Sequence, residues 1–100
     1  MSRPRPAPWL VAYDIAHPRR LRRVHAILVR YGLPVQYSVF LVHATPAGLD
    51  ALFDELAAVI HPRHDDVRAY RLPPELWYRC VGSPALPRGL LAALEGFGVV

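Results

Sequence analysis

Apolar positions in the first third of the chain change from a continuous run to a helical spacing. Residues Trp9 to Ile15 are almost all apolar and include β-branched and aromatic side chains, which predicts a strand buried on both faces. Apolar residues then recur at every third or fourth position, which predicts a helix over about 19–31. These residues are Leu21, Val24, Leu28 and Tyr31. Pro18 suits the first turn of this helix, and Gly32 suits its C-terminal cap.

The middle of the chain predicts further strands and a second helix. Residues 33–44 are rich in β-branched and aromatic side chains, which indicates a bent strand or a tight hairpin. Thr45 and Pro46 suit the N-cap and the first position of a helix that ends near residue 61. A last core strand is predicted over 67–72, before two consecutive prolines. The apolar residues of the second helix are Leu49, Leu52, Phe53, Leu56 and Ile60.

This order of elements predicts an α+β fold, the ferredoxin-like βαββαβ sandwich, with an antiparallel sheet and two helices on one face. Residues 1–8 are expected to form a flexible N-terminal lead-in, and residues 9–73 the ferredoxin-like domain. Residues 74–100 are expected to form a C-terminal strand, a short helix and a tail. The strand, at 76–81, would be the fifth, and would pair with a second copy and complete a homodimer by covering apolar sheet and an open edge.

The composition is basic, and it bears on the partner of the chain and on its cellular compartment. The chain carries a formal charge of +4, and all twelve of its cations are arginines. Arginine matches phosphate with two donors, so a nucleic-acid partner is permitted. GC-rich codon usage is the alternative explanation for the missing lysine, but it does not explain where the arginines cluster. Cys80 is the single cysteine, which excludes an intramolecular disulfide and a cysteine metal site. With no membrane span or signal sequence expected, the predicted location is cytoplasmic.

One carboxylate and a cluster of arginines carry the candidate chemistry. Asp14 closes the first apolar run, where a carboxylate is costly unless it is paired, hydrogen-bonded or bound to a cation. The arginines follow near the start of the predicted helix, where the helix dipole disfavours positive charge. A polyanion would offset that repulsion, so we expect them to bind nucleic-acid phosphates with weak sequence preference. They are Arg19, Arg20, Arg22 and Arg23.

Three segments in register resemble the CRISPR-associated protein 2 family, the small proteins of spacer acquisition. The first is Tyr13-Asp14-Ile15, followed at short distance by the arginines. The second is Tyr31 to Phe40, with its tyrosine-glycine, glutamine and serine-valine-phenylalanine signature. The third is Asp66 to Leu72, which is similar to the last core strand of the family. The resemblance covers residues 9–73.

The resemblance implies a homodimer in which two Asp14 carboxylates share a divalent metal, which we expect to be magnesium. Asp14 is then both the metal ligand and the catalytic residue. Tyr13, Ser38 and Phe40 are expected to support the site, with Ser38 in a polar role beside the metal and Phe40 in packing. Plain core is the alternative for Phe40. Leu41 stands where the family commonly has a glutamate, which lowers the expected hydrolytic activity.

The histidines are less informative. His17 lies in the turn before the first helix, where it could be a proton donor, a metal ligand or a phosphate contact, or a solvated loop residue, which we favour. A second polar group lies after the second helix and is interpreted as an exposed turn, because Pro62 breaks the helical spacing that a metal pair needs. This group consists of His61, His64, Asp65 and Asp66.

Two functions fit these predictions best. The first is a dimeric magnesium-dependent endonuclease, an endoribonuclease or DNase, that takes part in spacer acquisition. The alternative is a non-catalytic dimeric DNA-binding adaptor that bridges subunits of the CRISPR integrase (Cas-one). A regulatory or metabolite-binding ferredoxin-like domain is a third interpretation, and it leaves the arginine cluster unexplained.

Overall fold

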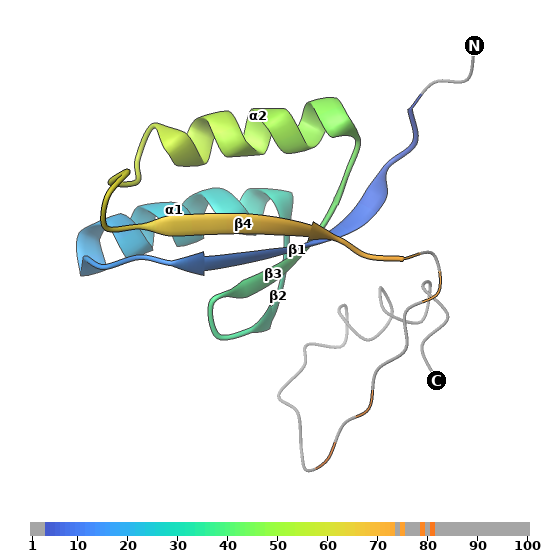
Figure 1. Ribbon diagram of the computed structural model, residues 1–100, viewed down its shortest axis with the longest axis horizontal. Helices are drawn as coiled ribbons and strands as arrows, with labels where there is room; N and C mark the ends of the chain where they lie inside the picture. The colour runs from blue at the N-terminus through green and yellow to red at the C-terminus, as the bar shows by residue number, and fades with distance from the viewer. Residues whose placement is uncertain (1–3, 74, 76–78, 80, 82–100) are drawn as a thin grey trace.

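The computed structural model describes residues 4–73, 75, 79 and 81, and this part of the chain folds into strands and helices in the predicted order (Figure 1). Strand β1 leads into helix α1, strands β2 and β3 form a hairpin, and helix α2 leads into strand β4. The bounds are β1 Ala7–Asp14, α1 Pro18–Tyr31, β2 Gly32–Gln36, β3 Val39–Ala44, α2 Pro46–Ala57 and β4 Asp66–Arg71.

The four strands form one antiparallel sheet in the order β2-β3-β1-β4, with both helices on the same face (Figure 1). This arrangement confirms the ferredoxin-like prediction. Strand β1 begins at Ala7, two residues earlier than predicted, and next to it the Leu72 amide donates to the Pro8 carbonyl at 3.0 Å. The predicted fifth strand at 76–81 lies outside the described residues apart from Arg79 and Val81, and the predicted helix at 88–95 lies wholly outside them.

The core lies between the helices and the sheet. On the central strands β1 and β3, Val11, Tyr13, Phe40 and Val42 are buried against the helices, because alternate side chains of a strand point to the same face. On β1, Val11 is fully buried while Leu10 and Ala12 are half-buried, so the predicted burial on both faces is complete only on the face toward the helices. The core cluster comprises Val11, Tyr13, Val24, Leu28, Phe40, Val42, Ala44, Leu52 and Leu56.

The helix ends follow the predicted chemistry with one difference. The Thr45 hydroxyl accepts a hydrogen bond from the Gly48 amide at 3.1 Å, which confirms the N-cap of α2. Gly32 caps α1, but its backbone is extended rather than left-handed. Glycine is needed there because a Cβ atom would lie 2.2 Å from the Leu41 carbonyl oxygen on β3. Neither helix of the described part is long and apolar enough to cross a membrane.

Candidate functional site

Asp14 is the exposed last residue of β1, and it lies directly opposite the first residue of β4, Asp66. Directly opposed residues of an antiparallel pair project to the same face of the sheet, so the two carboxylates are neighbours. Asp66 is partly neutralised by Arg68, whose Nε lies 2.7 Å from its Oδ2. One chain therefore presents a pair of carboxylates at this end of the sheet, of which the sequence predicted only Asp14.

The donors at this end suit a magnesium ion but do not complete a site within one chain. Magnesium prefers oxygen ligands and keeps several waters, so two carboxylates with water and phosphate oxygens suffice. The described residues contain no group of three or more histidine, cysteine, aspartate or glutamate side chains that could hold a metal. The residues present therefore fit magnesium only if a second chain, or a bound nucleic acid, supplies further oxygens.

The tip of the β2–β3 hairpin meets β1 beside Asp14. Ser38 has a positive φ of 65°, and its carbonyl oxygen accepts a hydrogen bond from the Tyr13 amide at 3.0 Å. The structure thus brings the Ser38 backbone next to the end of β1, while a polar role of its side chain beside a metal stays a prediction. Tyr37, at the same tip, is 89% exposed. Burial raises the pKa of the Tyr13 hydroxyl, and the nearby Tyr37 raises it further.

Phe40 belongs to the core rather than to the chemistry of the site. It is 1% exposed and faces the helices from β3. Its ring lies 6.2 Å from the Tyr13 ring and 5.5 Å, edge-on, from the His25 ring. Phe40 therefore supports the site only by packing beneath Tyr13, the residue that precedes Asp14.

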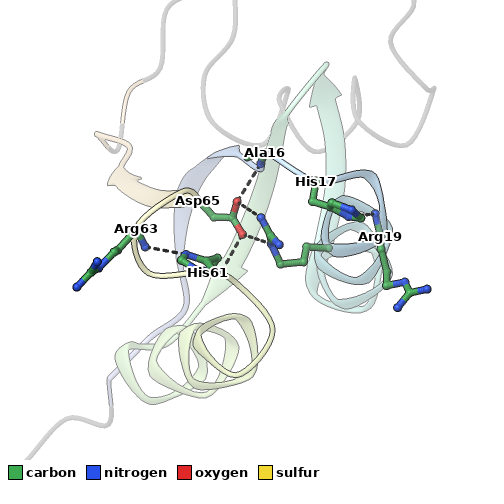
Figure 2. Close-up of polar contacts among 7 residues, drawn as sticks. Ala16, His17, Arg19, His61, Arg63 and Asp65 are labelled. Atoms are coloured by element: carbon green, nitrogen blue, oxygen red, sulfur yellow. Dashed lines mark hydrogen bonds and ion pairs between the residues drawn. The ribbon is translucent and has the colours of Figure 1, made fainter.

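His17 is the N-cap of α1. Its Nδ1 accepts a hydrogen bond from the Arg19 amide at 3.1 Å, as Figure 2 shows. Amides in the first turn of a helix have no partner within the helix, so this contact satisfies one of them. The structure thus gives His17 a local structural role, while a role in metal or phosphate binding stays a prediction.

Arg20 makes a two-donor ion pair with Asp65 between the start of α1 and the loop after α2. Its Nε lies 2.6 Å from Oδ2 of Asp65, and its Nη2 lies 3.2 Å from Oδ1. Asp65 also accepts backbone hydrogen bonds from Ala16 at 2.9 Å and His61 at 2.8 Å (Figure 2). We call these four contacts the clasp. The Asp65 side chain has no exposed surface, so the prediction of an exposed turn is wrong at this residue.

The clasp keeps Asp65 ionised in spite of its burial. The hydrogen bonds from Arg20 hold the pKa of the Asp65 carboxyl well below its usual range, and burial opposes this shift. The amides of His61 and Ala16 lower the pKa further, followed by the positive charge of Arg20. A carboxylate that accepts several hydrogen bonds is favoured in its charged form, so the ion pair persists at neutral pH.

The other three predicted arginines form one exposed face of α1. Arg19, Arg22 and Arg23 are exposed and make no ion pair within the part of the chain that the structure describes. Arg22 and Arg23 follow Arg19 by three and four residues, a spacing that places each of them beside Arg19 on a helix. We call them the arginine face. Arg20 differs from them because its guanidinium group points to Asp65.

Comparison with known proteins decides the family. Residues 8–79 match the family model described as CRISPR associated protein Cas2. The chain belongs to the Cas2 family. A Cas2 relative from Nitrosomonas europaea, named a CRISPR-associated endoribonuclease, is 35% identical over 82% of this chain and 78% of its own length. Another from Thermodesulfovibrio yellowstonii, of the same name, is 44% identical over 66% of this chain and 72% of its own length.

Solved structures agree with the Cas2 assignment. Cas2 of Streptococcus pyogenes, crystallised at pH 6.5, superposes with a TM-score of 0.62 at 37% identity and covers 66% of this chain and 86% of its own. A hypothetical protein from Thermus thermophilus superposes with a TM-score of 0.73 at 26% identity and covers 83% of this chain and 99% of its own. The ferredoxin-like fold of this Cas2 chain is therefore shared with experimentally determined structures.

Sequence reasoning missed two carboxylates of this Cas2 site. Asp65 and Asp66 were grouped as one exposed polar turn, yet the structure buries the first and places the second opposite Asp14. The available signal was their position at the start of a predicted strand, where neighbouring residues face opposite sides. Only the pairing of β4 with β1 shows which of the two joins Asp14.

Proposed function

We propose that two copies of this chain form a magnesium-dependent nuclease that hydrolyses phosphodiester bonds in RNA or DNA during CRISPR spacer acquisition. The observation that carries the proposal is the exposed Asp14 carboxylate opposite Asp66 at one end of the sheet. The names of the Cas2 relatives, which describe endoribonucleases, support the reaction class. Such a protein acts in the cytoplasm, in keeping with a chain that has a single cysteine.

The proposal assigns a residue to each part of the chemistry. Asp14 from each chain holds the shared metal, and Asp66 lies beside it as a further oxygen donor. When bound, magnesium polarises the phosphodiester and lowers the pKa of an attacking water. The arginine face binds the phosphate backbone, because guanidinium groups without carboxylate partners are available to phosphate oxygens.

A non-catalytic adaptor is the second candidate function. In that role a dimer binds duplex DNA and bridges subunits of the CRISPR integrase (Cas-one) without cutting. Leu41 favours this alternative, because it is 4% exposed and fills with an apolar side chain the position at which a second carboxylate was expected. The arginine face serves the adaptor as well as it serves the nuclease, since phosphate binding needs no metal.

Asp14→Ala separates the two functions when two assays are run side by side. The first follows cleavage of labelled RNA and duplex DNA with magnesium, and the second follows spacer acquisition with the cognate integrase. The nuclease proposal predicts that both are lost, whereas loss of cleavage with intact acquisition favours the adaptor. Asp50→Ala is the matched control, because it removes an exposed aspartate of α2. Wild-type protein that cleaves nothing across pH and metal ions would refute the nuclease.

The shared metal also requires a dimer. Light scattering at micromolar concentration is expected to give twice the mass of one chain. A monomer under these conditions would rule out a site built from two Asp14 residues, because magnesium then has only the carboxylates of one chain.

A further inference from the structure

The clasp joins three segments that are far apart in the sequence. Asp65 takes hydrogen bonds from Ala16, which is 49 residues away, and from Arg20, which is 45 residues away. The third segment is the turn after α2, through the amide of His61. Figure 2 shows the carboxylate in the middle, with donors approaching from each side. Asp65 therefore fixes the loop after β1 against the loop before β4.

Both carboxylates of the candidate site lie next to this junction. Ala16 follows Asp14 by two residues, and Asp66 follows Asp65 directly. Asp14 and Asp66 are the last pair of the β1–β4 ladder, and like charges directly opposite each other destabilise an antiparallel pair. A strand end that carries such a repulsion frays unless another contact holds it. The clasp supplies that contact on both strands at once.

We propose that Arg20 and Asp65 are a positioning pair that holds Asp14 and Asp66 in register, and that Arg20 acts through Asp65 and does not bind nucleic acid. Where it concerns the metal, the inference rests on the proposed function above. Arg20 donates two hydrogen bonds to one buried carboxylate, and its side chain is only 26% exposed. Among the described residues the arginine face has no carboxylate partner, so the cluster divides into one positioning residue and three phosphate contacts.

Hydrogen exchange tests the positioning role without metal or nucleic acid. Asp65→Ala and Arg20→Ala are expected to speed exchange of β1–β4 amides around the Tyr13–Val67 pair more than around the Trp9–Arg71 pair at the far end. Arg20→Lys keeps the charge but not the two-donor fork, so it is expected to give the same pattern of faster exchange with a smaller change. This variant replaces the alanine variants in the test if those do not fold.

Glu55→Ala is the matched control for these variants. It removes another ion pair between distant segments, because Glu55 binds Arg30 and Tyr31 between α1 and α2. It leaves the loops on either side of Asp14 and Asp66 untouched. Glu55→Ala is expected to lower overall stability and therefore to reduce protection equally at both ends of the ladder. The same equal loss in Asp65→Ala would overturn the positioning role.

Salt dependence of duplex binding tests whether Arg20 contacts phosphate. Each phosphate contact that is lost reduces the slope of log affinity against log salt by about 0.9. Arg22→Ala is expected to show this reduction, whereas Arg20→Ala is expected to keep the wild-type slope. A slope reduced in Arg20→Ala as much as in Arg22→Ala would overturn the division of the arginine cluster.

Binding of Mn²⁺, followed by its electron paramagnetic resonance, links the clasp to the metal. We expect Asp65→Ala, Arg20→Ala and the double variant to weaken Mn²⁺ binding to a similar extent, by about tenfold, because each breaks the same support. Glu55→Ala is expected to bind as the wild type does. Unchanged binding in Asp65→Ala would overturn the inference. Wild-type protein that binds no Mn²⁺ would instead refute the proposed metal site, and hydrogen exchange and the salt slope would still decide on the clasp.

Discussion

Asp14→Asn is expected to make the protein more stable in the absence of metal and less stable than wild type in its presence. Asp14 faces Asp66 across the β1–β4 ladder, so the folded state brings two negative charges together. Asparagine keeps the shape of the side chain and removes one of the charges. A residue retained for binding at the expense of stability is common at functional sites.

The structure sets the size of both effects. Like charges directly opposite on an antiparallel pair cost about 0.2–1 kcal/mol. Arg68 relieves part of this cost, but its ion pair with Asp66 is largely exposed, with 64% and 48% of the two side chains accessible. We therefore expect a gain of about 0.5 kcal/mol for Asp14→Asn, or roughly 2–4 °C in Tm. Magnesium at ten times its Kd stabilises only the wild type, by about 1.4 kcal/mol.

Thermal unfolding with EDTA and then with magnesium measures both effects at one fixed protein concentration. The expected result is a reversal, with the variant ahead in EDTA and the wild type ahead in magnesium. Asp50→Asn is the control, because it removes a negative charge from an exposed position of α2 without an opposed carboxylate. Its Tm is expected to differ from the wild type by little, and equally in both buffers.

Two results would refute this reasoning. A lower Tm for Asp14→Asn in EDTA would mean that Asp14 makes a favourable contact in the folded state, which contradicts the opposed carboxylates. Equal stabilisation of the wild type and the variant by magnesium would mean that the ion binds elsewhere. The first result concerns the register of β1 and β4, and the second concerns the metal, so the two can be distinguished.

Three further predictions concern the framework of the site. In a urea titration, Gly32→Ala is expected to lower the free energy of unfolding by about 1–3 kcal/mol, because its Cβ would lie 2.2 Å from the Leu41 carbonyl oxygen. Gly48→Ala is the control: its closest contact is at 3.3 Å, and it should change the free energy of unfolding by less than about 1 kcal/mol. Thr45→Ala removes the N-cap of α2 and should cost about 1 kcal/mol, whereas Thr45→Ser should retain most of it. The pKa of Asp65 is lowered in the folded state, so the clasp contributes fully at neutral pH and loses its contribution as the pH falls below about 4. The stability difference between wild type and Asp65→Ala should therefore shrink in acid, and a difference independent of pH would contradict the ion pair.

The order of elements could be predicted because the signals for it are local. The stripe from Leu21 to Tyr31 and the Thr45-Pro46 pair each lie within a few residues of the structure that they specify. The ferredoxin-like topology then follows from the order and the short connections. Asp14 was found in the same way, as a polar residue at the end of an apolar run.

The rest of the site depends on pairing between distant segments. Asp65 and Asp66 are adjacent in sequence, and nothing local indicates that one is buried under Arg20 while the other opposes Asp14. The reason for Gly32 was likewise outside its own helix, in the carbonyl of Leu41 on the neighbouring strand. In each case the sequence identified a residue as unusual, and the tertiary structure supplied the physical cause.

The division of the arginine cluster changes how the charge of this protein should be counted. Arg20 is paired with Asp65, so the two residues together add no net charge for a nucleic acid to meet. Arg19 repels Arg22 and Arg23, which follow it by three and four residues on α1, and like charges at such spacings cost about 0.2–0.5 kcal/mol per pair. Their position near the start of α1 adds to this cost, because the helix dipole is positive there. A phosphate backbone along this face would relieve both repulsions, so the arrangement that weakens the free helix is the one that strengthens the complex.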